Sequence, residues 1–464
     1  MTEVFRTEKD SIGALRVPID AYYGVQTLRA KENFKITGTS VNSEFIRSIT
    51  EIKIAAAITN KEAGVLSEDI ADAIIKAGNE VLNGKFLNDF IVDAIQGGAG
   101  TSLNMNANEV LANRAIEHLG THKGNYSIVH PNDHVNCGQS TNDVYPSAGK
   151  IAVIRHLYKG IDALKKLKGA LDDKSEEFKD IVKMGRTEMQ DAVPVTLGQT
   201  FSAFSSAISR DIKRFYQAIE VLSILNMGGT AIGTGINANP EYIKKIVKNI
   251  SVITGLELKQ AHNLIDATQN LDDFVFVSGI LKSCAATISK ISNDLRLMSS
   301  GPRTGFGEIN LPARQNGSSI MPGKINPVMP EMINQVAFNI IGNDLTITMA
   351  AEAGQLELNA FEPVIFYCFF ESLEMLTNGI AAFTDFCVKG ITANEENCKM
   401  EIENSLGLLT ALCPHIGYTK ASNLAKRALK EGKKISELLL EEQIMSPEEV
   451  DKVFSQALAS CKNI

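Results

Sequence analysis

The sequence lacks features that mark several large classes of protein. Its seven cysteines are scattered and include no CxxC pair, which argues against zinc and redox motifs and favours a reducing compartment. The 46 lysines and arginines are outnumbered by 54 acidic residues, so no basic surplus is present to neutralise nucleic-acid phosphates. Small anionic substrates remain open, because a few local cations can override the net charge of -8.

Long apolar runs are also missing. The longest apolar patch, VIFYCFF at 364–370, is much shorter than the ~18 residues that a membrane-spanning helix needs. The N-terminus, MTEVFRTEKD, is charged and has no apolar signal-peptide core. We therefore expect a soluble cytoplasmic protein that binds neither membranes nor nucleic acid.

Familiar catalytic motifs are absent as well. The chain contains no GxSxG, no Walker A, no HExxH and no Cys/His nucleophile pair. The segment GGTAIGTG at 228–235 is similar to a dinucleotide loop but follows a helical pattern instead of a strand. His134 lies beside a joint, where a lone histidine is more often a structural hydrogen-bonding group. No metal site is predicted.

Long helical periodicity dominates the sequence. Apolar residues recur at helical spacing over six segments, which are 43–63, 144–180, 198–225, 267–299, 328–350 and 361–388. Several of these segments far exceed the mean helix of ~11–12 residues. Such long helices with broad apolar faces predict a mainly α protein built around a helix bundle.

Changes in pattern along the chain predict three domains. Residues 1–141 form a mixed, mostly helical N-terminal domain, and residues 142–393 form the central bundle. Residues 394–464 have shorter helical patterns and form a small C-terminal domain. Within it, SPEEVDKVFSQAL begins with serine and carries glutamate three residues later, a capping-box pattern.

Five joints between the helices are rich in Gly, Ser, Thr and Asn. They are QGGAGTSLNMN (96–106), VNCGQSTND (135–143), MGRTEMQDAVP (184–194), NMGGTAIGTGINANP (226–240) and NGSSIMPGKINPVMP (316–330). One explanation is that small polar residues are what loops are made of. The other is that five such joints together form an anion site, because hydroxyls, amides and glycine-rich backbone all donate hydrogen bonds.

Two cations and one helix start strengthen the anion-site hypothesis. Lys324 supplies one positive charge, and Arg186 is a candidate for a second. Asn326 followed by Pro327 predicts a helix start, and helix N-termini attract anions. A neutral donor set with one or two cations suits a small dicarboxylate.

The joints also resemble a known family. GSSIMPGKINP is similar to the signature loop of the fumarase/aspartase superfamily, whose pattern is GSSxMPxKxNP, and HVNCGQSTND and QGGAGTSLNMNANEV match two further motifs. The matches run from about residue 5 to residue 450. GGAGTS, STND and GRTEMQDAVPVTLGQ resemble the aspartate ammonia-lyases within this superfamily more than the fumarases.

The resemblance implies a fold, a reaction and a set of roles. It implies a homotetramer with a shared central helix bundle, active sites assembled from several subunits, and elimination of ammonia from L-aspartate to give fumarate without an organic cofactor. It makes Ser318 the general base. It assigns Lys324, Asn326, Thr141 and the backbone beside Ser319 to an aci-carboxylate intermediate. It assigns the α-carboxylate and the ammonium to Thr101, Ser140, Asn142 and Thr187.

Position 188 departs from the family pattern, because related enzymes usually carry His or Gln where this chain carries Glu188. One hypothesis is that Glu188 faces the substrate ammonium and favours amino acids over hydroxy acids; the other is that it points away and pairs with Arg186 or solvent. Fumarate hydratase, or a superfamily lyase acting on a related amino acid, is the alternative function. A non-catalytic structural homologue is the third, and the intact Ser318, Lys324 and Asn326 argue against it.

Overall fold

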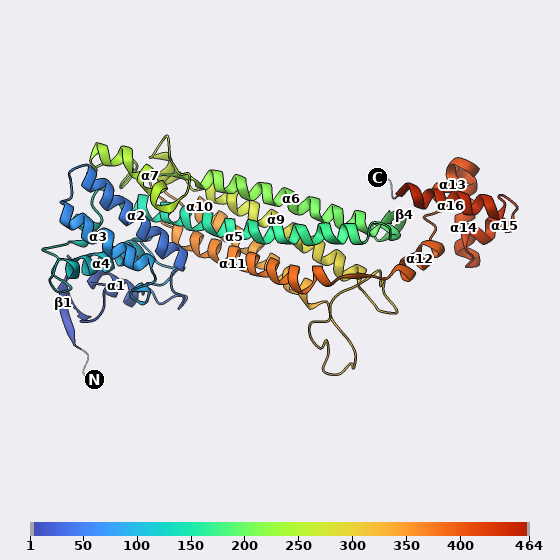
Figure 1. Ribbon diagram of the computed structural model, residues 1–464, viewed down its shortest axis with the longest axis horizontal. Helices are drawn as coiled ribbons and strands as arrows, with labels where there is room; N and C mark the ends of the chain where they lie inside the picture. Colours follow the sequence, from blue (N-terminus) through green and yellow to red (C-terminus); the bar gives the residue numbers. More distant parts are fainter. Residues whose placement is uncertain (1–3, 462–464) are drawn as a thin grey trace. The chain divides into compact units, whose positions relative to one another are not determined.

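The computed structural model describes residues 4–461, with side chains described to residue 456, and the chain is mainly helical (Figure 1). Its contacts form two compact units. Unit 1 comprises Met1–Ile161, Lys213–Ser283 and Asn339–Met375, and unit 2 comprises Asp162–Ile212, Cys284–Phe338 and Leu376–Ile464. The three-domain division expected from the sequence stays a prediction, since units defined by contacts need not coincide with segments defined by sequence pattern.

Five long helices each contribute one part to each unit. They are α5 (Thr141–Glu177), α6 (Leu197–Leu222), α9 (Asp272–Met298), α10 (Val328–Glu352) and α11 (Glu362–Phe386). The helices expected from apolar periodicity are therefore confirmed, and so is the helix start after Pro327. The only interior proline of α5 is Pro146, in its second turn, so the remainder keeps its hydrogen-bond ladder.

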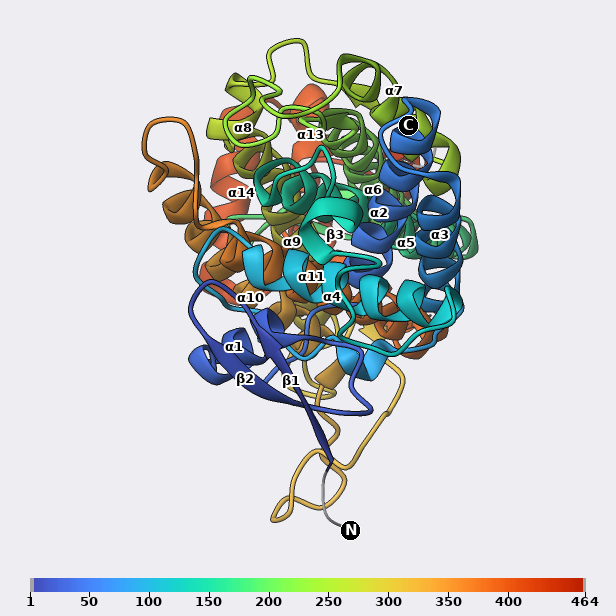
Figure 2. The same ribbon diagram turned by 90° about the vertical axis from the view of Figure 1, so that its left-hand side faces the viewer.

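Unit 1 contains the N-terminal elements. Its strands are β1 (Phe5–Lys9), β2 (Ala14–Pro18), β5 (Ile224–Leu225) and β6 (Lys259–Gln260), and its further helices are α1 (Val25–Asn33), α2 (Ser43–Glu62), α3 (Glu68–Leu82), α4 (Thr101–His118), α7 (Pro240–Thr254) and α8 (Asp266–Gln269). β1 and β2 pair antiparallel beside α1 (Figure 2), and β5 pairs parallel with β6. α2 contacts α3, α4 and α7, so it lies at the centre of this group.

The core of unit 1 is rich in aromatic rings. Phe366 of α11 lies 5.2 Å from Phe45 of α2, 5.7 Å from Tyr145 of α5 and 5.2 Å from Phe274 of α9, measured between ring centroids. All four rings are buried. Edge-to-face packing of this kind adds about 0.5–1.5 kcal/mol per pair beyond area burial, so it ties the helices of this unit together.

Unit 2 contains a β-hairpin, a small sheet and the C-terminal helices. Its strands are β3 (Val182–Thr187), β4 (Gln190–Thr196), β7 (Ile309–Asn310) and β8 (Thr392–Ala393), and its further helices are α12 (Glu395–Asn404), α13 (Leu409–Ile416), α14 (Tyr418–Glu431), α15 (Ile435–Glu441) and α16 (Pro447–Cys461). β3–β4 and β7–β8 are antiparallel pairs. The predicted capping box is confirmed, because the N–H of Ser446 donates to Glu449 Oε2 at 2.8 Å and the N–H of Glu449 donates back to Ser446 Oγ at 3.2 Å.

Two helices are long and apolar enough to cross a membrane by length and composition alone, α9 and the segment Glu362–Gly390 that contains α11. About half of each apolar window is buried inside the protein. Polar contacts also hold α9 to α10, since Ser278 Oγ donates to Asp344 at 2.7 Å and Lys282 Nζ donates to the same carboxylate at 2.6 Å. Both helices therefore have the properties of core helices in a bundle.

Candidate active site

The turn at 140–143 places its polar groups at the N-terminus of α5. The N–H of Ser140 donates to Asp143 Oδ1 at 2.9 Å, and the N–H of Asn142 donates to Ser140 Oγ at 3.2 Å. Thr141, the first residue of α5, is buried, whereas Ser140 and Asn142 are half-buried. The free N–H groups of a helix N-terminus attract anions, so this turn can hold a carboxylate.

Asp143, the last residue of this turn, connects it to a neighbouring segment by hydrogen bonds. It is completely buried, and its Oδ2 accepts hydrogen bonds from the N–H groups of Gly228 at 3.2 Å and Thr230 at 3.0 Å. The amide of Asn142 donates to the carbonyl of Ala231 at 2.7 Å. The glycine-rich segment 226–240 therefore supports the turn. Burial raises the pKa of Asp143 to about 6, although the three backbone donors act in the opposite direction.

Lys53 of α2 supports the same turn from another side. It is fully buried, and its Nζ donates to Asn136 Oδ1 at 2.8 Å and to Gln139 Oε1 at 2.9 Å. Burial lowers the pKa of Lys53 to about 7, and the nearby charge of Asp143 acts in the opposite direction. A buried lysine thus fixes the chain just before Ser140.

Thr101 begins α4 and is exposed. Asn104, one turn later, donates from Nδ2 to Thr141 Oγ1 at 3.0 Å, which joins the first turns of α4 and α5. Thr101 also lines a pocket of about 460 Å³ together with Ser102, Arg29 and Asn132. Four predicted site residues, Thr101, Ser140, Thr141 and Asn142, therefore belong to the same unit on two adjacent helix N-termini.

The loop at 316–327 belongs to unit 2 and is largely exposed. Ser318 Oγ accepts hydrogen bonds from the N–H groups of Ile320 at 3.2 Å and Met321 at 3.0 Å. Two donors aimed at one hydroxyl oxygen favour its ionised form. Two backbone N–H groups of the same loop are thus directed at the Ser318 oxygen.

The loop is closed by its own backbone. The N–H of Gly317 donates to the carbonyl of Lys324 at 2.9 Å, and Asn326 Nδ2 donates to the carbonyl of Gly317 at 2.8 Å. A Cβ added at Gly317 would lie 2.3 Å from the Lys324 carbonyl oxygen, so only glycine fits there. The exposed Lys324 ammonium makes no ion pair within residues 4–456, which leaves its charge available for an anion.

Thr187 and Glu188 stand at the tip of the β3–β4 hairpin. Thr187 pairs with Gln190, and the two residues between them, Glu188 and Met189, have φ values of 52° and 65°. This two-residue turn usually takes Asn and Gly, because other L-residues disfavour positive φ. Backbone strain of this kind is characteristic of functional sites. The sequence pattern predicted a joint between helices here, and the structure corrects this to a hairpin.

Arg186 does not have the free charge that was expected from the sequence. Its guanidinium pairs with Glu308, which is completely buried, and with Glu401 of α12 at 2.9 Å. Lys183 pairs with the same Glu308 at 3.0 Å. This expectation was therefore wrong, because the charge of Arg186 is already balanced within unit 2. The same pairs overturn the idea that Glu188 is held by Arg186.

The predicted site residues belong to segments that are divided between the two units. The two helix N-termini are in unit 1, whereas the hairpin tip and the 316–327 loop are in unit 2. In the described part of unit 2, no hydrogen bond or ion pair joins the hairpin tip to the loop. Sequence reasoning missed three residues that hold the turn by hydrogen bonds, Asp143, Lys53 and Asn104. Asp143 belongs to the STND motif and Asn104 to QGGAGTSLNMN, whereas Lys53 lies in no motif.

Comparison with known families identifies two matching segments. A family described as "Lyase" matches residues 13–342, and one described as "Fumarase C C-terminus" matches residues 408–457. The chain is 51% identical over 450 residues to an aspartate ammonia-lyase of Bacillus sp., covering 97% of this chain and 96% of that protein. It is 50% identical over 458 residues to the aspartate ammonia-lyase of Escherichia coli strain K12, covering 98% and 96%.

Solved structures agree with these matches. A fumarate lyase:delta crystallin from Brucella melitensis bound to cobalt superimposes with a TM-score of 0.96 at 46% identity, covering 99% of this chain and all of that chain. The recombinant class II fumarase from Schistosoma mansoni superimposes with a TM-score of 0.94 at 36% identity, covering 97% and 98%. The predicted fold class is thereby confirmed over nearly the whole chain.

Proposed function

The chain belongs to the lyase family that includes the aspartate ammonia-lyases and the class II fumarases, and we propose that it reversibly removes ammonia from L-aspartate to give fumarate. The observation that carries this proposal is identity of about half the residues to aspartate ammonia-lyases over 97% of the chain. The substrate is a small dicarboxylate, and the enzyme is a carbon–nitrogen lyase.

The chemistry requires a base and a site for a dianion. The proton to be removed lies next to the β-carboxylate, which is already an anion, so the carbanion is viable only as an aci-carboxylate with charge spread over the carboxylate oxygens. In this proposal Ser318 removes the proton, and the N–H groups of Ile320 and Met321 stabilise its alkoxide. The new charge is held by Lys324, Asn326, Thr141 and the backbone beside Ser319.

The opposite side of the substrate needs neutral donors and a helix terminus. Thr101, Ser140, Asn142 and Thr187 are proposed to bind the α-carboxylate and the ammonium. The two helix N-termini at Thr101 and Thr141 add N–H donors where the carboxylate would lie. Ammonia leaves as a neutral molecule and needs no added proton, so this side requires no general acid.

Glu188 is proposed to set the preference for an amine. Its carboxylate is exposed at the hairpin tip, and a carboxylate at ~4 Å from an ammonium gains roughly 4 kcal/mol at an effective dielectric of ~20 before desolvation. A carboxylate equally close to the α-carboxylate would repel it. We therefore orient Glu188 toward the ammonium.

The proposal includes a homotetramer with shared active sites. Helix α10 presents exposed apolar side chains at helical spacing, Phe338 (65% exposed), Ile341 (41%), Leu345 (62%) and Met349 (64%). A continuous apolar stripe of this size supports burial against another copy of the chain. Light scattering on the purified protein tests this; a monomer at micromolar concentration would contradict it. A cytoplasmic location is also proposed, supported by six free cysteines in the described side chains.

One assay tests the activity itself. Fumarate absorbance is followed with purified protein and L-aspartate, and then with L-malate. The proposal expects fumarate from L-aspartate and little from L-malate. Rapid conversion of malate alone would favour fumarate hydratase, the second candidate supported by the 36% identity to a class II fumarase. No fumarate from either substrate would contradict both enzyme functions and favour a non-catalytic structural homologue.

A further inference from the structure

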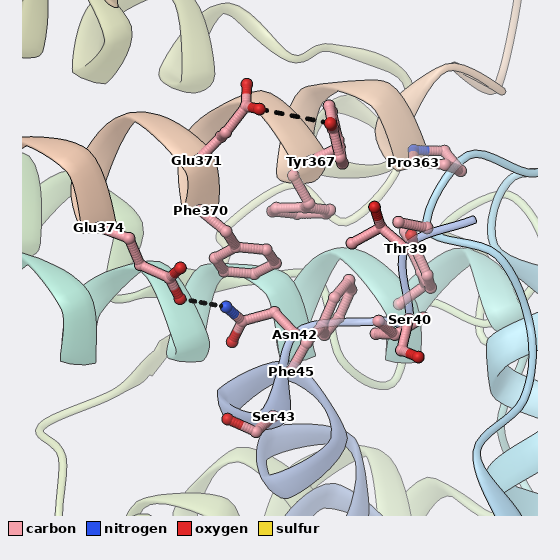
Figure 3. Close-up of a pocket in the computed structure, with 14 residues that line it drawn as sticks. Thr39, Ser40, Asn42, Ser43, Phe45, Pro363, Tyr367, Phe370, Glu371 and Glu374 are labelled. Atoms are coloured by element: carbon pink, nitrogen blue, oxygen red, sulfur yellow. Dashed lines mark hydrogen bonds between the residues drawn. The ribbon is translucent and has the colours of Figure 1, made fainter. Parts of the chain in front are cut away.

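A pocket in unit 1, separate from the predicted site residues, lies between the start of α2 and the first half of α11 (Figure 3). Its volume is about 400 Å³, within the range of ~300–1,000 Å³ that small-molecule sites occupy. Its lining includes none of the residues assigned to the substrate or to the base.

One wall of the pocket is aromatic. Phe45 lies 5.2 Å from Phe366 and 5.5 Å from Phe370 between ring centroids, and Tyr145 lies 4.8 Å from Phe45. Tyr145 is only 2% exposed, and its hydroxyl makes no hydrogen bond to any other described residue. This hydroxyl is therefore available to a polar atom of a ligand in the pocket.

The other wall is acidic. Glu371 and Glu374 stand three residues apart on α11, and both line the pocket. In Figure 3 the Glu374 carboxylate turns toward Asn42, and the Glu371 carboxylate lies beside the Tyr367 hydroxyl. Their partners are neutral, since the Tyr367 hydroxyl donates to Glu371 at 3.3 Å and Asn42 Nδ2 donates to Glu374 at 2.7 Å. Asn343 also donates to Glu371 at 3.2 Å. None of the 14 lining residues, all within the described chain, is Lys, Arg or His.

We propose that this pocket binds a small organic amine, an ammonium group carried on an aromatic or branched apolar body. The two carboxylates attract the ammonium, and the aromatic rings attract it further through their faces while packing against the apolar body. The same carboxylates repel dicarboxylates, so neither L-aspartate nor fumarate is the ligand. The pocket therefore adds a ligand class to the molecule that the proposed reaction does not use, and it stands whether or not that reaction is correct.

The test uses the full-length protein in its native oligomeric state with 2-phenylethylamine as the probe in isothermal titration calorimetry. We expect saturable binding with one site per chain. The double variant Glu371→Gln/Glu374→Gln weakens binding by about a hundred-fold, roughly ten-fold for each charge-assisted hydrogen bond. The control double variant Glu437→Gln/Glu448→Gln removes two exposed charges on α15 and α16 and leaves binding unchanged.

Two further measurements distinguish an amine site from an apolar pocket and from a metal site. 2-Phenylethanol, which keeps the ring and lacks the charge, binds at least about ten-fold more weakly. Equal binding of the alcohol, or undiminished binding in the Glu371/Glu374 variant, would overturn the proposal, provided that circular dichroism matches the parent protein. Absence of binding by the parent protein would overturn it as well. Displacement of the amine by Mg²⁺ would assign the carboxylates to a metal instead.

Discussion

The turn at 140–143 and the loop at 316–327 carry complementary parts of the proposed chemistry, and the protein holds them in opposite ways. Two fully buried ionisable residues hold the turn, Asp143 at its end and Lys53 of α2. Asp143 accepts a hydrogen bond from the N–H of Ser140, and Lys53 donates to the side chain of Asn136 just before the turn. The loop has no such support, and its hydrogen bonds run between its own residues, as in the pair between Gly317 and Lys324.

This difference suits the turn to substrate binding and the loop to movement. A turn held by buried polar groups keeps its donors in place before substrate arrives, which lowers the cost of binding. A loop held only by hydrogen bonds among its own residues keeps its internal shape and can still move as a unit over the substrate. Substitutions in the loop should therefore change the rate without changing stability, whereas substitutions behind the turn should change stability.

The largest effect is expected from the loop. Ser318→Ala removes the proposed base and should lower kcat for L-aspartate by about a thousand-fold, within the range for general base catalysis. The melting temperature should change by no more than a degree or two, because the side chain is not part of a packed core. Fumarate absorbance and thermal unfolding measure the two quantities. A matched change at Gln315→Ala should leave kcat intact; an active Ser318→Ala enzyme would remove the base from this residue.

The shape of the loop gives the second test. Gly317→Ala places a methyl group against the carbonyl of Lys324, so the loop must open and kcat should fall by about a hundred-fold, as for a small misplacement of catalytic groups. Gly323→Ala is the control, since a Cβ there meets nothing within 4 Å and its cost is confined to a positive φ of 80°. Equal activities of the two variants would show that the closed loop is dispensable.

The region behind the turn gives the third test, through pH. The pKa of Lys53 is about 7 in the folded protein and that of an unperturbed lysine is 10.5, so between these values the unfolded chain binds a proton that the folded chain does not. Stability should therefore rise with pH in this window by up to roughly 1.4 kcal/mol per unit. Lys53→Met should lose that slope.

Urea unfolding at fixed protein concentration, repeated across this pH window, measures the slope. The exposed Lys76→Met variant serves as the matched control and should keep the slope of the parent protein. If Lys53→Met and the parent protein have parallel stability curves, Lys53 does not titrate between folded and unfolded states as its burial requires.

The smallest effect is expected at the hairpin tip. Glu188→Gln keeps the shape of the side chain and removes its charge, so kcat/KM for L-aspartate should fall by about ten-fold relative to that for L-malate, a difference of ~1.4 kcal/mol. Met189→Leu changes the same turn without changing charge and should preserve the ratio. An unchanged ratio in Glu188→Gln would mean that its carboxylate does not face the ammonium.

Most of the fold could be predicted from sequence because it rests on long amphipathic helices. The apolar periodicity of the segments that became α5, α6, α9, α10 and α11 extends over so many turns that local exceptions do not obscure it. The hairpin β3–β4 was missed for the opposite reason. Its turn residues, Glu188 and Met189, are not the Asn-Gly pair that announces such turns, and β4 contains Pro194.

The support of the site could not be predicted, because it depends on contacts between distant segments. Lys53 occurs among alternating charges on α2, a pattern typical of a solvated helix face, yet it is completely buried. Its partners, Asn136 and Gln139, are more than 80 residues away in sequence. Arg186 was assigned a free charge for a similar reason, since Glu308 and Glu401 come near it only in the folded chain.

The two-residue turn at the hairpin tip has a consequence for how new substrates can arise in this family. The Glu188 side chain is exposed and makes no hydrogen bond or ion pair to residues 4–456, whereas the neighbouring Arg186 is tied to two carboxylates. In the proposed site, a mutation at position 188 would therefore alter the charge offered to the departing group while the hairpin stays folded. Single substitutions at position 188 would then shift the preference between amino-acid and hydroxy-acid substrates without passing through an unstable protein.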